Sequence, residues 1–263
     1  MIVRLFKRIL LVTFLCFGIM LSNSVAQNTR KSTFNNIGWY NFFGTFNINK
    51  KWSILTEYQF RRTHLITTWQ QSLLRLGINY QLYPNVQLRV GYAWIETFPY
   101  GEIPINGMGK QFTEHRIFEA LTLTNKTGIF DITHRFILEQ RFVGKYTSSI
   151  LNNEDKFPLW HRMRYMLKIQ VPLKKDLSSG HFPYIAFYDE VLIGFGKNVN
   201  ENIFDQNRVG VLLGYKFNNN LKLEIGYLNQ TLQLGRRVNN QIVFQYNNGL
   251  IINTLLNIDF SKH

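Results

Sequence analysis

The sequence predicts an all-β protein, a transmembrane antiparallel up-and-down β-barrel preceded by a cleaved signal peptide. Three features of the chain predict this fold class. Long stretches alternate apolar and polar residues, the connections between them alternate between short and long, and the first residues have the pattern of an export signal. At 263 residues the chain is long enough for one large β domain.

The stretch Trp160 to Leu173, WHRMRYMLKIQVPL, shows the alternation most clearly. One set of alternate side chains is apolar: Met163, Tyr165, Leu167, Ile169 and Val171. The other set is polar and strongly basic: Arg162, Arg164, Lys168 and Gln170. Successive side chains of a strand point to opposite faces, whereas helical spacing would mix the two sets. The stretch also exceeds the roughly 9–11 tilted residues with which a strand crosses a bilayer.

Residues 1–26 are expected to be a signal peptide and residues 27–263 the mature barrel domain. The basic residues Arg4, Lys7 and Arg8 precede the apolar stretch Ile9 to Leu21, and the small residues Ser24-Val25-Ala26 follow it. This apolar stretch is too short for an ordinary spanning helix, and no longer one follows it. Insertion into a membrane therefore requires a closed barrel, because lipid offers no partner to an open sheet edge.

The composition excludes several kinds of site. The single cysteine, Cys16, lies in the expected leader, so the mature chain has no disulfide and no thiolate metal site. Leu15 stands where a lipoprotein anchor would need a small residue. The net charge is +14, but the arginines lie inside alternating stretches rather than in clusters on loops or helices. Nucleic-acid binding is therefore not expected.

The first half of the chain contains six expected strands. Phe34 to Phe46 is rich in aromatic residues. The next three oppose apolar and polar faces, with apolar sets Ile54, Tyr58 and Phe60 in Trp52 to Arg62, Leu74, Leu76, Ile78 and Tyr80 in Trp69 to Leu82, and Leu88, Val90, Tyr92 and Trp94 in Val86 to Thr97. Phe112 to Thr124 is less regular, and Ile129 to Val143 sets Ile132, Phe136, Leu138 and Phe142 against charged residues.

Five expected strands form the second half. After Trp160 to Leu173 comes Phe182 to Gly194, which carries Glu190 among tyrosines. The apolar sets of the remaining three are Val209, Val211, Leu213 and Tyr215 in Phe204 to Phe217, Leu221, Leu223, Ile225 and Tyr227 in Leu221 to Leu234, and Leu250, Ile252, Leu256, Ile258 and Phe260 in Asn248 to Phe260.

The strand count and the connections indicate an outer-membrane barrel. The connections after Phe46, Leu82, Thr124, Leu173 and Phe217 are short, and longer ones include Phe98–Gln111, Gly144–Lys156 and Gly235–Gln245. Tight turns at one end and long loops at the other are typical of such barrels. Because bacterial single-chain barrels have an even number of strands, we expect about 12 strands, with 10 as the alternative.

The apolar faces could instead fill a soluble β-barrel. Against that, the polar faces are rich in Arg, Glu and Gly, and Phe260 gives the chain a terminal aromatic strand. Aromatic residues also recur near strand ends, where they suit the headgroup region: Trp39, Trp52, Trp69, Tyr83, Trp94, Trp160, Phe182 and Phe217. We therefore expect the apolar faces to meet lipid and the protein to lie in the outer membrane of a bacterium.

Several short motifs recur in a characteristic order along the mature chain. They are EYQFRR at Glu57–Arg62, SLLRLGINY at Ser72–Tyr80, VQLRVGYAW at Val86–Trp94, TEHRIFEAL at Thr113–Leu121, THRFILEQRF at Thr133–Phe142, RMRYML at Arg162–Leu167, YDE at Tyr188–Glu190, DQNRVGVLLGY at Asp205–Tyr215 and LEIGYLNQ at Leu223–Gln230. In this order the chain resembles the outer-membrane β-barrel family catalogued as domain of unknown function 2490. The resemblance implies a barrel and a location, but no reaction.

The inward-facing charges are the candidate functional residues. They are Glu57, Arg61, Arg75, Arg89, Glu114, Arg116, Arg135, Glu139, Arg141, Arg162, Arg164, Glu190, Arg208 and Glu224. Buried charges need partners, and arginine pairs well with carboxylates, so one interpretation is a lumen closed by ion pairs. The other is a narrow anion-preferring channel, because the arginines outnumber the carboxylates. Small anionic solutes would be the partners of such a channel, and membrane lipid is a partner of either.

A membrane-embedded lipid-modifying enzyme of the acyl-hydrolase type is the alternative class. His115 and His134 have outward parity, but the nearby hydroxyls are those of Thr113 and Thr133 rather than a serine. The acidic pairs Glu154 with Asp155 and Glu201 with Asp205 could bind calcium in loops, but such pairs are usually only solvated. We therefore expect no catalytic residue, no metal and no cofactor. The sequence does not indicate an oligomeric state.

Overall fold

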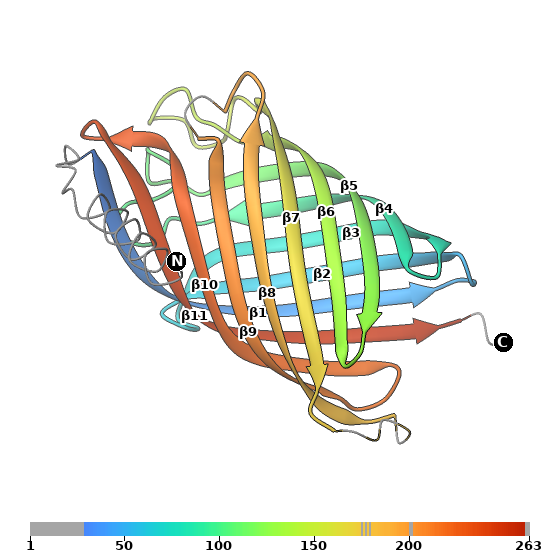
Figure 1. The fold of residues 1–263 in the computed structure, drawn as a ribbon. Helices are drawn as coiled ribbons and strands as arrows, with labels where there is room; N and C mark the ends of the chain where they lie inside the picture. Colours follow the sequence, from blue (N-terminus) through green and yellow to red (C-terminus); the bar gives the residue numbers. More distant parts are fainter. Residues whose placement is uncertain (1–28, 175, 177, 179, 200–201, 261–263) are drawn as a thin grey trace, which may run out of the picture.

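Eleven strands form one closed barrel in the computed structural model, which describes residues 29–174, 176, 178, 180–199 and 202–260 (Figure 1). The strands are β1 (Arg30–Asn47), β2 (Trp52–Thr63), β3 (Thr68–Tyr83), β4 (Val86–Thr97), β5 (Phe112–Thr127), β6 (Phe130–Val143), β7 (Leu159–Pro172), β8 (Phe182–Phe195), β9 (Phe204–Lys216), β10 (Leu221–Val238) and β11 (Gln241–Asp259). The expected signal peptide, residues 1–26, lies outside the described residues. No helix of the described part is long and apolar enough to cross a membrane.

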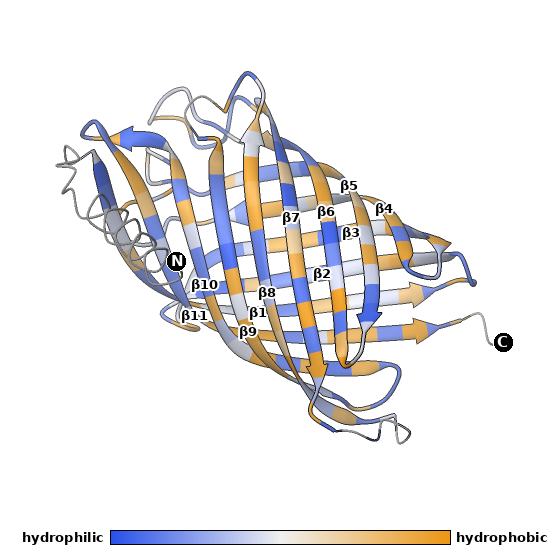
Figure 2. Cartoon of the chain, viewed as in Figure 1, coloured by the Kyte–Doolittle hydropathy of each residue, from blue (hydrophilic) through white to orange (hydrophobic). Residues whose placement is uncertain are grey.

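The predicted alternation produces this barrel. In β7, Arg162 and Arg164 are buried inside, whereas Met163 and Tyr165 are exposed on the outer surface. Apolar and polar bands alternate along the other strands in the same way (Figure 2). The all-β barrel predicted from the sequence is confirmed.

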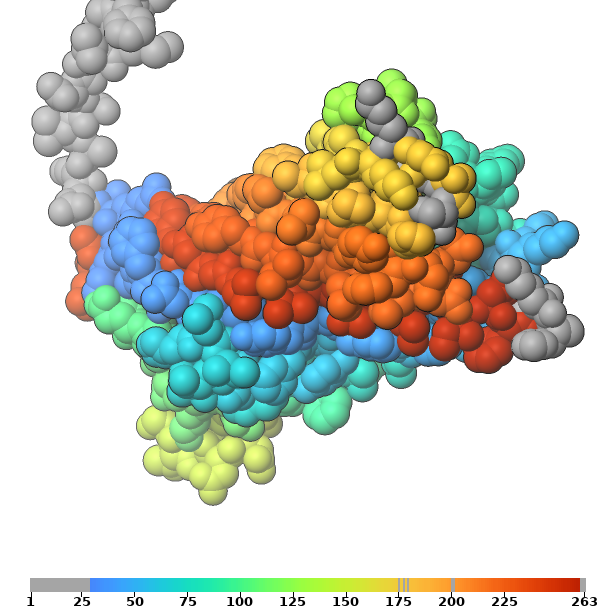
Figure 3. Space-filling view, turned by 90° about the horizontal axis from the view of Figure 1, so that it is seen from below, coloured from blue at the N-terminus to red at the C-terminus, as the bar shows by residue number. Residues whose placement is uncertain are grey.

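The number of strands is odd, and the reason lies in how the barrel closes. Consecutive strands pair antiparallel, but β1 and β11 pair parallel, from Arg30 beside Ile242 to Asn47 beside Asp259. Viewed from below, the red C-terminal strand lies beside the blue first strand (Figure 3). The expectation of about twelve strands rests on an even number, which follows when the first and last strands pair antiparallel. A parallel pairing of β1 and β11 allows an odd number.

Asparagine side chains reinforce this seam from within. The Nδ2 of Asn35 donates to Oδ1 of Asn247 over 2.8 Å, and Asn41 donates to Asn253 over the same distance. Both pairs lie in register across the parallel strands. A buried amide costs free energy unless it is hydrogen-bonded, so each bond satisfies one donor and one acceptor at the seam.

The longest loops gather at one end of the barrel, where β1 begins, and β11 ends at the other (Figure 1). The expectation of a long loop at Gly235–Gln245 is wrong. There β10 and β11 continue to a tight turn at Asn239 and Asn240, whose φ angles are 50° and 60°. The polar run from Gln245 to Asn248 interrupts the alternation, but inside the barrel Gln245 and Asn247 are fully buried and hydrogen-bonded.

The interior also has an apolar side, formed by β1 and β8 to β11. Its buried residues are Ile37, Trp39, Tyr184, Ala186, Leu212, Leu228 and Ile251. Inward glycines make room for rings, since the side chain of Tyr184 covers Gly214 and that of Phe118 covers Gly91. The lumen is therefore filled by packed side chains as well as by charges.

Three of the aromatic residues expected at the headgroup region lie inside instead. Trp39 is only 3% exposed, Phe182 packs against the apolar cluster, and Trp160 lines an internal cavity. Trp39 shares its parity with the inward Ile37 and Asn41, and it lies in the middle of β1 (Arg30–Asn47) rather than near a strand end. Trp52 and Trp94 do lie on the outer surface.

The outer surface gives a direct test of which face meets lipid. Val211 is exposed in the middle of β9, between Phe187 of β8 and Tyr227 of β10. We predict that Val211→Arg destabilises the barrel refolded in lipid vesicles by about 2–4 kcal/mol, the cost of a cation at the bilayer midplane. The control is Gln170→Arg, because Gln170 points inward and pairs in register with Asp131. Equal losses in urea-unfolding titrations would contradict the assignment of the two faces.

Candidate functional site

The structure places the candidate charges on the inner wall of β2 to β10. Of the fourteen, eleven are buried, and Arg89, Arg135 and Arg141 are partly buried. Most of them meet in one cluster, here named the lumen ion-pair network. It consists of Glu57, Arg75, Glu114, Arg116, Arg135, Glu139, Arg141, Arg162, Arg164, Glu190, Asp205 and Arg208.

Glu139 of β6 is the centre of this network and is 1% exposed. Its Oε2 accepts a hydrogen bond of 2.7 Å from Nε of Arg162, and its Oε1 accepts one of 2.8 Å from Nη1 of Arg164. Arg116 and Arg75 approach Oε1 to 3.6 and 4.0 Å. A single carboxylate thus links β6 to β3, β5 and β7 across the lumen. Four surrounding guanidinium groups compensate its negative charge in place of bulk water.

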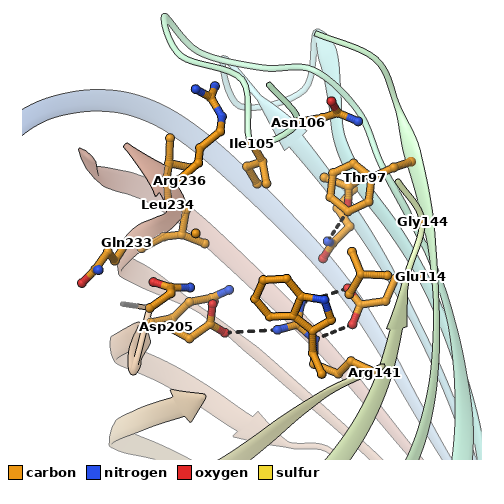
Figure 4. Close-up of a pocket in the computed structure, with 18 of the residues that line it drawn as sticks. Thr97, Ile105, Asn106, Glu114, Arg141, Gly144, Asp205, Gln233, Leu234 and Arg236 are labelled. Atoms are coloured by element: carbon orange, nitrogen blue, oxygen red, sulfur yellow. Dashed lines mark hydrogen bonds and ion pairs between the residues drawn. The ribbon is translucent and has the colours of Figure 1, made fainter. Parts of the chain in front are cut away.

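Other carboxylates extend the network in both directions. Glu114 binds Arg116 and Arg141, each with contacts of 2.5 and 3.0 Å to its two oxygens. This bidentate geometry is the strongest arrangement for arginine and carboxylate. Asp205 then bridges Arg141 and Arg162. Figure 4 shows Asp205 and Arg141 at the cavity.

On the other side of Glu139, Glu190 of β8 gathers three arginines. Its carboxylate lies 2.7 Å from Arg164, 3.0 Å from Arg135 and 3.3 Å from Arg208. Charges of opposite sign therefore alternate from Glu114 on β5 to Arg208 on β9. The inner wall is cross-linked by ion pairs over most of its charged side.

Asp205 is a member of the network that the sequence pattern did not reveal. By simple alternation it shares the outward parity of Val209, and the sequence suggests for it only a loop calcium site with Glu201, which lies outside the described residues. The pairing of β8 and β9 shifts register here, with Leu192 opposite Gln206 and Ile193 opposite Phe204. This bulge turns Asp205 inward, because an extra residue changes the phase of the strand.

One further ion pair of the lumen, between Lys168 and Glu224, lies apart from the network. Nζ of Lys168 approaches Oε1 of Glu224 to 2.6 Å, and the same carboxylate accepts bonds from Tyr184 and Asn253. The alternation of β7 indicated that Lys168 belongs to the basic face, so this partner could have been anticipated.

Two candidate arginines have no carboxylate partner among the described residues. Arg61 lies 3.7 Å from the ring centre of Trp39, and its guanidinium donates to Gln59 and Gln71. Arg89 donates to Asn79 over 2.5 Å and to Gln87 over 3.2 Å. Both cations are therefore held by neutral groups, which leaves an excess of positive charge in the lumen.

A cavity of about 350 Å³ lies between the network and the long loops. Its floor includes Glu114, Arg141 and Asp205 (Figure 4). The connection between β4 and β5, residues 98–111, folds inward over it: Ile103 packs against Leu232, Leu234 and Val243 of β10 and β11.

Tyr100 anchors the same inward loop. Its hydroxyl donates to Gln245 over 3.2 Å and accepts a bond from Asn247. Burial raises the pKa of Tyr100, so its hydroxyl remains neutral at physiological pH and serves as donor and acceptor. The inward fold of this loop was not predicted, because its contacts come from distant strands.

The residues considered for catalysis and for calcium have ordinary partners. Nδ1 of His115 lies 2.5 Å from the hydroxyl of Tyr92, and Nδ1 of His134 lies 2.9 Å from that of Tyr165. Both pairs lie on the outer face, and Thr113 donates to Glu96. Glu154 and Asp155 accept bonds from Thr113 and Thr147. The described residues contain no group of three or more acidic, histidine or cysteine side chains that could hold a metal ion.

Comparison with known proteins now gives the family. The family model described as "Protein of unknown function (DUF2490)" matches residues 36–241. The chain belongs to this family. The resemblance predicted from the sequence motifs is therefore confirmed.

A solved structure described as "NanC porin structure in rhombohedral crystal form" is similar to the chain, with 12% sequence identity and a TM-score of 0.43. The similarity covers 78% of this chain and 91% of that one. Among curated proteins, none matches the chain significantly.

Because Glu139 is the centre of the network, its substitution should strongly reduce the stability of the barrel. Glu139→Gln leaves Arg162 and Arg164 with one carboxylate fewer in a site without bulk water. We predict a loss of about 3–5 kcal/mol in the free energy of unfolding, measured by denaturant titration of the refolded protein.

The control for this variant is Glu102→Gln, which removes an exposed ion pair with Lys31. That change should alter the stability by less than about 1 kcal/mol. Similar effects of the two substitutions would show that the buried network does not stabilise the barrel.

Proposed function

We propose that the protein is an integral barrel of the bacterial outer membrane whose arginine-rich lumen is held closed by ion pairs. The membrane half of the proposal is supported by the outer surface. Exposed apolar side chains cover consecutive strands, for example Leu76, Val90 and Ile117 on β3, β4 and β5 and Leu213 and Ile225 on β9 and β10. A continuous apolar surface of this kind is far larger than a soluble monomer exposes.

The closed lumen is supported by how its cross-section is filled. Glu139, Arg162 and Arg164 are between 1% and 4% exposed, although they point into the lumen from β6 and β7. The apolar cluster around Trp39 and Leu228 fills the opposite side. An ion cannot pass such a section without breaking ion pairs. The buried hub at Glu139 is the observation that carries this proposal.

A narrow anion-preferring channel is the second candidate, and one observation favours it. Arg61 and Arg89 add positive charge that no described carboxylate pairs with. If the packed side chains move apart, the passage that opens is lined mainly by arginine and attracts small anions.

Single-channel recording in planar bilayers separates the two candidates. For the closed barrel we predict no steady conductance above that of detergent alone. For the channel, the wild-type protein conducts with a reversal potential that favours anions, and high salt weakens this preference by screening. In that case Arg162→Gln with Arg164→Gln reduces the preference.

The matched control is Lys50→Gln with Lys51→Gln, which removes the same charge from an exposed turn outside the lumen. A steady conductance of the wild-type protein would contradict the closed barrel. Recovery of the mature chain as a soluble periplasmic protein would contradict the membrane location.

A further inference from the structure

The cavity above the ion-pair network has the properties of a ligand site. Its volume of about 350 Å³ falls in the range of small-molecule pockets, roughly 300–1,000 Å³. Its walls come from distant parts of the chain, including Phe112 of β5, Trp160 of β7 and Leu234 of β10. The inward loop 98–111 contributes Ile105 and Met108 to the lining.

Three residues that line this cavity each carry a buried polar atom without a hydrogen-bond partner. Nε1 of Trp160, Nε of Arg236 and Oδ1 of Asn202 are buried and make no hydrogen bond. Asn202 and Trp160 both lie within 4 Å of the position that a side chain at Gly235 would take. Buried polar groups are nearly always satisfied in native proteins, so three of them at one cavity indicate a polar binding partner.

The charge of the lining defines the sign of that partner. The lining holds six cationic side chains, Arg61, Arg116, Arg141, Lys145, Arg208 and Arg236, and two carboxylates, Glu114 and Asp205. The carboxylates are shared by Arg116, Arg141 and Arg162. Arg61, Lys145 and Arg236 have no ion-pair partner in the described part of the chain. The two unpaired donors, on Trp160 and Arg236, also suit an anion.

The apolar part of the lining defines the shape of the partner. Phe112, Leu232 and Leu234 line the cavity together with the ring of Trp160, over which Nζ of Lys145 lies at 4.9 Å. A flat apolar body fits between such groups, and the free acceptor of Asn202 suits a hydroxyl or N–H on it.

We propose that this cavity binds a small organic anion with a flat apolar body, an acidic group and a hydrogen-bond donor. The acidic group lies toward Lys145 and Arg236, the cations without an ion-pair partner among the described residues, and the donor faces Asn202. This site goes beyond the proposed closed barrel, because it lies between the network and the long loops and does not require passage through the network.

Three probes built on one ring test the proposal: 4-hydroxybenzoate, its neutral amide 4-hydroxybenzamide, and the cation tyramine. Binding is measured by calorimetry and by tryptophan fluorescence on the refolded full-length mature barrel, with protein-free micelles as the blank. We expect saturable binding of 4-hydroxybenzoate, at least about tenfold tighter than that of the other two.

Arg236→Gln should weaken binding of 4-hydroxybenzoate about tenfold, the factor expected for one charge-assisted hydrogen bond. Trp160→Phe, which removes the indole donor and reduces the size of the ring, should weaken it as well. The matched controls Arg62→Gln and Trp94→Phe lie outside the cavity and should not change it.

Equal affinity of the wild-type protein for the three probes, or no binding of any of them, would overturn the proposal without any variant. Binding that is unchanged by Arg236→Gln and Trp160→Phe in folded protein would also overturn the proposed site. Each variant is checked first for the gel shift on heating that marks a folded barrel. These results do not depend on whether the lumen conducts, so the closed barrel and the ligand site can fail separately.

Discussion

The interior of this barrel depends on one constraint, the cost of keeping charges away from water. A buried carboxylate or guanidinium loses several kcal/mol of hydration and regains it only from close partners of opposite charge. Glu139 meets this constraint by accepting hydrogen bonds from Arg162 and Arg164 while Arg75 and Arg116 lie within 4.0 Å. Since these residues belong to four strands, satisfying one charge fixes the relative positions of β3, β5, β6 and β7.

The rest of the fold is consistent with a filled rather than a hollow barrel. The side of the lumen that lacks charges is closed by packing around Trp39, Leu212 and Leu228. The parallel seam between β1 and β11 is lined by hydrogen-bonded asparagine pairs. At the end with the long loops, residues 98–111 turn inward and leave a cavity over the network. The described side chains thus fill the middle of the lumen and leave a cavity toward the long loops.

The sequence predicted the parts of this structure that follow from the alternation of side chains between the two faces of a strand. The inward positions of Arg162, Arg164 and Glu139 could be read from alternation alone, because a strand has only two faces. Asp205 could not, since a bulge in β9 reverses its direction. The strands around Gln245 could not either, because polar residues on both faces look like a loop until their partners on β1 and β10 are known.

The closure and the cavity depend on contacts that no local pattern encodes. Nothing in the residues of β1 or β11 specifies a parallel seam, and the even count of other bacterial barrels favoured twelve strands. The inward position of Tyr100 depends on Gln245 and Asn247, which are far away in the chain. Long-range pairings of this kind are the part of a fold that sequence periodicity does not determine.

The central claim is that Glu139 and its arginines act as a unit, and a double-mutant cycle tests it most directly. Unfolding free energies are measured in lipid vesicles for the wild-type protein, Glu139→Gln, Arg162→Gln and the double variant. If the pair is coupled in the buried network, the double variant is less destabilised than the sum of the two single variants, by about 1–3 kcal/mol. Additivity within about 0.5 kcal/mol would contradict the claim, because it would show that Glu139 and Arg162 contribute independently.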